Sequence, residues 1–83
     1  MGIELRLEWY DKKTEALESD EYSSFGDDDS IIIALGLDKE AEIFDGGYDV
    51  RSTWIAVIQP HFQHRIDPDC FDYQISFRYR KHH

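Results

Sequence analysis

The sequence predicts an α+β fold in which a four-stranded antiparallel β-sheet carries one short helix packed on one face. Two observations predict the sheet: apolar and polar residues alternate at both ends of the chain, and turn-forming residues separate the alternating segments. A third predicts the helix, because an apolar run near the middle lies between residues that start and stop helices. With 83 residues, the chain is expected to form a single domain spanning residues 1–83.

The first and the last strand along the chain are predicted from strict alternation of apolar and polar residues. Apolar residues at 3, 5, 7 and 9 alternate with polar ones through Tyr10, and residues 71–80 repeat the pattern more cleanly. A period of two places all apolar side chains on one face, which the rest of the domain must cover. Between them, residues 11–24 show no dependable period, and we expect a long, acidic, partly ordered loop there.

Turn signals define the remaining two strands. The Asp45-Gly46-Gly47 turn opens an extended segment that runs over residues 48–58, and Pro60 should end or bend it. Residues 61–67 alternate again and are expected to form the third strand along the chain. The Asp67-Pro68-Asp69 stretch is then the turn that leads into the last strand.

The helix is predicted within residues 27–37. Residues 27–30 (three aspartates and a serine) supply N-cap side chains and favourable charge, and Gly36 lies where a C-terminal glycine belongs. Residues 31–35 between them make about two turns. Three consecutive isoleucines favour a strand instead, so a short strand is the alternative for this segment.

Charge divides the chain into an acidic and a mildly basic part. Residues 1–49 hold fifteen acidic and four basic side chains, a net of −11, whereas residues 50–83 have a net of +2. The total is −9. A negative potential of this size attracts a basic protein partner and repels nucleic acid.

The composition argues against a membrane protein and against a secreted, disulfide-bonded protein. No apolar run approaches the ~20 residues of a membrane span, and the N-terminal charged alternation is unlike a secretory signal. Cys70 is the only cysteine, which excludes an internal disulfide and fits a reducing compartment. We therefore expect a soluble cytoplasmic protein. His82 and His83 resemble the stub of a purification tag.

No metal, cofactor or catalytic residue is expected. His61 and His64 would point to opposite faces of a strand, and with Cys70 they match no zinc spacing. Residues 27–29 lack the alternating ligands and closing glutamate of a calcium loop, so helix capping accounts for them. The chain has no glycine-rich phosphate loop and no serine or cysteine beside a recognisable base.

Two tyrosines among carboxylates are candidates for an interface. Tyr10 falls on the polar face of the first strand, and Tyr48 follows the glycine turn beside Asp49. Exposed aromatic residues embedded in charged ones are typical of binding hot spots. The alternative is that each ring lies flat on the sheet and binds nothing.

Several stretches together resemble one family. They are Met1-Gly2, residues 7–12, 21–23 and 25–28, Ser30, Leu35-Gly36, residues 48–50, Trp54, Gln59-Pro60, Phe62, His64, Ile66-Asp67 and Ser76-Phe77. In this order and spacing they resemble the cloacin-type immunity proteins, the small inhibitors made alongside ribosome-inactivating RNase colicins. The resemblance runs essentially end to end, with one residue missing around Ser24.

This resemblance implies a four-stranded antiparallel sheet with a short helix, and it favours a helix for the isoleucine run. It also implies a partner, the basic C-terminal RNase domain of a cognate colicin, and a complex that is released together with the bacteriocin. The inhibitor would dock beside the catalytic cleft and block the approach to the ribosome. Neither a cofactor nor direct contact with nucleic acid is implied.

The toxin-binding residues that we expect combine the resemblance with the acidic, aromatic pattern. They are Tyr10, Leu17, Glu18, Glu21, Gly47, Tyr48 and Asp49. The resemblance gives position 47 the role of discriminating between similar toxins; Gly47 stands where relatives carry cysteine or tryptophan, which leaves the cognate colicin open. A different class of function, an acidic nucleic-acid mimic that inhibits another basic protein, is the alternative.

Overall fold

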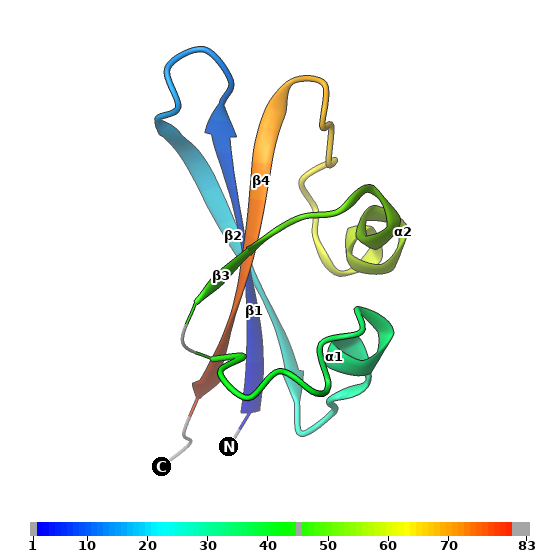
Figure 1. Ribbon diagram of the computed structural model, residues 1–83. Coiled ribbons are helices and arrows are strands. Elements are labelled where there is room, and N and C mark those ends of the chain that lie inside the picture. The colour runs from blue at the N-terminus through cyan, green and yellow to red at the C-terminus, as the bar shows by residue number, and fades with distance from the viewer. Residues whose placement is uncertain (1, 45, 81–83) are drawn as a thin grey trace.

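The computed structural model describes residues 2–44 and 46–80, and the suggested tag remnant lies outside them. It contains a four-stranded sheet in the order β2-β1-β4-β3, with every neighbouring pair antiparallel (Figure 1). The predicted α+β class and four-stranded antiparallel sheet are confirmed. The elements are β1 (Gly2–Asp11), β2 (Leu17–Gly26), α1 (Ser30–Ala34), β3 (Gly47–Asp49), α2 (Ile55–Ile58) and β4 (Phe71–Arg80).

The core lies on one face of the sheet. β1 and β4 are confirmed as strands, and their apolar alternation gives one buried row on each strand. Both helices and their connecting segments cover this face, as Figure 1 shows, and leave the other face open. The buried residues are Ile3, Leu5, Leu7, Trp9, Ile31, Ile32, Leu35, Leu37, Ile43, Trp54, Ile58, Phe62, Ile66, Tyr73, Ile75 and Phe77.

The predicted loop over residues 11–24 is wrong, because most of it is the edge strand β2. β2 pairs with β1 along its whole length, in a register that aligns Leu7 with Glu21 and Leu5 with Ser23. The residues of β2 on the covered face are therefore largely polar, and the apolar alternation that marks a strand is absent. An edge strand that faces the rim of the core tolerates such a sequence.

The predicted strand over residues 48–58 is also wrong beyond its first residues. β3 ends at Asp49, and the chain turns helical through a 3₁₀ turn, α2 and a second 3₁₀ turn, Gln59–His61. Trp54 and Ile58 are four residues apart and both buried, which is a helical spacing. The β-branched residues of this segment favour a strand, but packing against the sheet overrides that local preference.

The strand predicted over residues 61–67 is wrong, because His61 ends the second 3₁₀ turn and residues 62–67 form an irregular segment. Phe62 and Ile66 are buried beside α2, and the side-chain amide of Gln59 donates to the carbonyl oxygen of His64 at 2.8 Å. The backbone N–H of Ile66 donates to the Gln59 side-chain oxygen at 2.8 Å. One glutamine thus supplies the backbone with the hydrogen bonds that a neighbouring strand would otherwise provide.

The helix predicted within residues 27–37 is confirmed as α1. The N-cap residue is Asp29, which makes no side-chain hydrogen bond to the helix, contrary to the predicted capping. Instead, the carboxylate of the preceding Asp28 accepts a hydrogen bond from the N–H of Ser30 at 2.9 Å, and this bond lowers the pKa of Asp28. Gly36 ends the helix with φ +74°, a conformation that glycine adopts without steric cost. In the described part of the chain, no helix is long and apolar enough to cross a membrane.

Candidate functional site

The side of the sheet that the helices leave uncovered is here called the open face (Figure 1). Alternation along each strand determines which side chains it carries. A central row from β1 runs between rows from β2 and β4, and β3 adds its two end residues. The open face consists of Glu4, Arg6, Glu8 and Tyr10; Asp20, Tyr22 and Ser24; Asp72, Gln74, Ser76 and Arg78; and Gly47 and Asp49.

An ion-pair network fixes the centre of the open face. The guanidinium of Arg6 donates to Asp20 at 2.8 and 2.9 Å and lies 3.3 Å from Glu8. The hydroxyl of Tyr10 donates to the same Glu8 carboxylate at 2.9 Å, which raises the pKa of Tyr10. The Tyr10 ring is therefore held in one orientation by a carboxylate that is itself anchored.

Tyr22 marks the half of the open face nearer the chain termini. Its ring lies 5.8 Å from the Arg6 guanidinium carbon and 6.0 Å from that of Arg78, and 44% of the residue is exposed. Both distances are within reach of a cation–π interaction. Arg6 and Arg78 thus already contact an aromatic ring of the protein itself. The other half of the open face, which contains Tyr10, is the more acidic of the two.

Four of the predicted toxin-binding residues come together on or beside the open face. Tyr10 is opposite Leu17 in the β1–β2 register, and Leu17 is 50% exposed. Gly47 and Asp49 lie opposite Ser76 and Gln74 in β4. Glu18 falls at the irregularity in the β1–β2 register and is exposed. The structure thus brings segments distant in sequence onto one surface.

Two predicted contacts, Tyr48 and Glu21, lie on the covered side. Tyr48 is opposite the fully buried Ile75 and packs against the core. Glu21 is opposite Leu7, and its two carboxylate oxygens accept hydrogen bonds from the backbone N–H groups of Gln63 at 2.7 Å and His64 at 3.0 Å. Glu21 therefore attaches the irregular segment after α2 to the edge strand.

Replacing Glu21 with glutamine should lower the free energy of unfolding by about 1–2 kcal/mol, because one charge-assisted acceptor is lost. Urea unfolding of both proteins measures this change. Glu18→Gln removes the same charge from an exposed site in the same strand and should change stability by less than about 0.5 kcal/mol. Equal stability of the two variants would contradict the structural role of Glu21.

The histidines and the cysteine have structural partners. His64 stacks on Trp9, with ring centroids 3.8 Å apart, and its Nε2 lies 2.8 Å from the hydroxyl of Tyr73. His61 packs edge-on against an aromatic ring of β2. The thiol of Cys70 donates to Asp67 at 3.2 Å, and this bond raises the pKa of Cys70. Among the described residues, no group of three or more histidine, cysteine, aspartate or glutamate side chains is placed to hold a metal ion.

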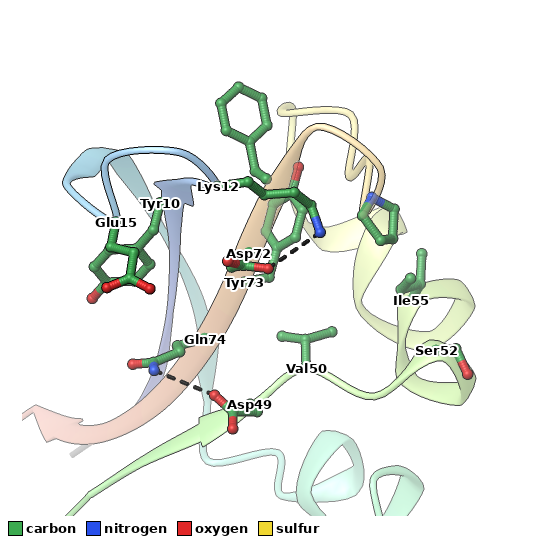
Figure 2. Close-up of a pocket in the computed structure, with 12 residues that line it drawn as sticks. Tyr10, Lys12, Glu15, Asp49, Val50, Ser52, Ile55, Asp72, Tyr73 and Gln74 are labelled. Atoms are coloured by element: carbon green, nitrogen blue, oxygen red, sulfur yellow. Dashed lines mark hydrogen bonds and ion pairs between the residues drawn. The ribbon is translucent and has the colours of Figure 1, made fainter.

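A cleft of about 650 Å³ adjoins the Tyr10 end of the open face (Figure 2). It lies between the first residues of β4 and the segment that leaves β3 for α2, and both Tyr10 and Asp49 line it. Asp72 and Val50 also line the cleft and were not predicted as site residues. A strand over residues 48–58 would have continued beside β4 at this position, so the sequence-based assignment left no room for a cleft.

Comparison with known protein families matches nearly the whole chain to one described family. The family described as "Cloacin immunity protein" matches residues 2–80. This range includes all four strands, both helices and every residue of the open face. The match therefore covers the whole described domain rather than a local motif.

Proposed function

The chain belongs to the cloacin immunity protein family, and from this membership we propose that it binds and inhibits the C-terminal ribosomal-RNase domain of a cognate colicin. Membership implies bacteriocin immunity and a bacteriocin as the partner. The match over residues 2–80 is the observation that carries the proposal. The inhibitor would protect the producing cell, in its cytoplasm, by blocking the access of the toxin to the ribosome.

Electrostatics support this partner. A domain that grips ribosomal RNA must be basic, and the whole chain has a net charge of −9. The open face itself carries five carboxylates and two guanidinium groups, a formal net of −3. An acidic face attracts the toxin, and its net negative charge would then oppose the phosphate backbone of the RNA.

We propose the open face as the toxin-binding surface, with Tyr10, Leu17, Gly47 and Asp49 in direct contact. Leu17 supplies exposed apolar area at one end, and the half-buried Tyr10 ring lies opposite it, which suits the desolvated centre of an interface. Glu18 lies beside Leu17 and would add charge at the rim. Glu21 and Tyr48 lie on the covered side and would contribute to binding indirectly, by stabilising the positions of β2 and β3.

Association with the cognate RNase domain should be fast, above about 10⁸ M⁻¹s⁻¹ at low salt, and should slow steeply as salt is added. Dissociation should change little, because it depends on short-range contacts that salt screens weakly. Stopped-flow mixing with a catalytically inactive RNase domain at several salt concentrations measures both rates. An association rate that does not depend on salt would contradict electrostatic steering.

A further inference from the structure

The cleft exists because β3 is too short to cover the edge of β4. The three residues of β3 pair with residues 74–76 of β4. One further hydrogen bond joins the strands, from the N–H of Val50 to the carbonyl oxygen of Tyr73 at 3.1 Å. The chain then turns away into α2, and the space left beside the start of β4 is the cleft (Figures 1 and 2).

The cleft has one acidic side and one apolar side. Glu15, Asp49 and Asp72 supply carboxylates, whereas Val50 and Ile55 supply apolar surface. In Figure 2, Val50 is drawn to the right of the carboxylates of Asp72 and Asp49, with Ile55 farther to the right. A side chain that enters here can therefore place methylene groups on the apolar surface while its end group reaches the carboxylates.

Among the described residues that line the cleft, Lys12 is the only cation, and it is weakly held. Its ammonium lies 3.3 Å from Asp72, with 43% and 62% of the two side chains exposed. Solvent screens exposed pairs of this kind, so they contribute little to stability. Asp49 accepts a hydrogen bond of 3.3 Å from the exposed amide of Gln74. Both carboxylates can thus exchange their present partners for an incoming cation.

We propose that this cleft receives an arginine side chain of the basic protein partner, whose guanidinium replaces Lys12 at Asp72 and also binds Asp49. Arginine fits better than lysine because its planar group donates to two carboxylates at once and stacks on aromatic rings. Tyr10 supplies such a ring at the mouth of the cleft. This inference rests on the proposed function, since it assigns one side chain of the same partner.

The test uses a small probe, so that it does not depend on any toxin. The protein is titrated with N-acetyl-arginine amide and followed by NMR of the backbone amides. We expect saturable shifts at Asp49, Val50, Ile55 and Asp72, and weaker binding of the lysine analogue. The citrulline analogue, which has nearly the same shape without the charge, should shift none of these amides. Shifts spread over all acidic segments, or equal binding of citrulline or lysine, would overturn the proposal.

Two pairs of variants separate the cleft from net charge. Asp72→Asn should weaken probe binding at least threefold, whereas Asp38→Asn, an exposed site in the segment after α1, should leave it unchanged. Lys12→Met should strengthen binding at least twofold, and Lys39→Met should not. Equal effects within each pair would overturn the cleft as the site. Localised probe binding without affinity for any RNase domain would contradict the proposed function instead, and leave the arginine-binding cleft standing.

Discussion

Replacing Gly47 with tryptophan should weaken binding to the cognate RNase domain by at least about 2 kcal/mol, roughly a thirtyfold rise in Kd. Gly47 is exposed in β3, where its side chain would belong to the open face. A Cβ atom there would lie 3.6 Å from the side-chain oxygen of Gln74 and 3.6 Å from the carbonyl oxygen of Ile75, which are ordinary contacts. The backbone therefore has room for a Cβ atom at this position, and a ring attached to it on the open face would project into the space that the proposed partner would occupy.

Calorimetric titration of the wild-type and Gly47→Trp proteins into the same RNase domain measures this effect. Thermal unfolding of the variant should stay close to that of the wild type, which separates a steric clash with the partner from a loss of structure. Gly47→Ala is the matched control and should change the affinity much less. An unchanged affinity for the tryptophan variant would remove Gly47 from the interface.

Replacing Tyr73 with phenylalanine should lower the free energy of unfolding by about 1–3 kcal/mol. Tyr73 is only 7% exposed, and its hydroxyl accepts a hydrogen bond from the N–H of Asp67 at 2.8 Å. The proton of that hydroxyl is then directed at Nε2 of His64, 2.8 Å away. Removing the hydroxyl leaves the N–H of Asp67 and Nε2 of His64 without this partner. Burial raises the pKa of Tyr73, and the same burial limits how well water can replace the lost oxygen.

Tyr79→Phe is the control for this variant. It makes the same chemical change in the same strand, but 47% of Tyr79 is exposed, so the lost hydroxyl remains compensated by water. Urea unfolding should show a clear loss of stability for Tyr73→Phe and almost none for Tyr79→Phe. Similar losses for both variants would show that the hydroxyl of Tyr73 has no special role in holding the segment before β4.

The strands with complete apolar rows could be predicted from the sequence; β3 was predicted only in its first residues, from the preceding turn, and β2 could not be predicted. β1 and β4 are central strands whose alternation follows directly from burying one face. β2 places polar residues such as Ser23 and Glu21 on the covered side, so its pairing with β1 becomes visible only in three dimensions. The segment around α2 has the composition of a strand, and only the burial of Trp54 and Ile58 four residues apart reveals a helix.

The same limits explain the predicted site. Tyr10 could be assigned to the polar side because the alternation of β1 is complete. The sequence predicts no pairing register for the strands that hold Tyr48 and Glu21, so it cannot assign these two side chains to a face. A shift of one residue exchanges the two faces of a strand. Asp72 could not be predicted as a lining residue of the cleft, because the cleft exists only where β3 ends early.

Titration of the protein into a panel of catalytically inactive cloacin-type RNase domains, at low and physiological salt, tests the central claim most directly. An immunity protein should bind one member tightly, one to one, with a nanomolar or lower Kd at physiological salt, and should bind the others weakly. Weak binding to every member that disappears at physiological salt would contradict inhibition of a specific toxin. Such a result would mean that the acidic surface attracts basic proteins without recognising any of them, as a nucleic-acid mimic would.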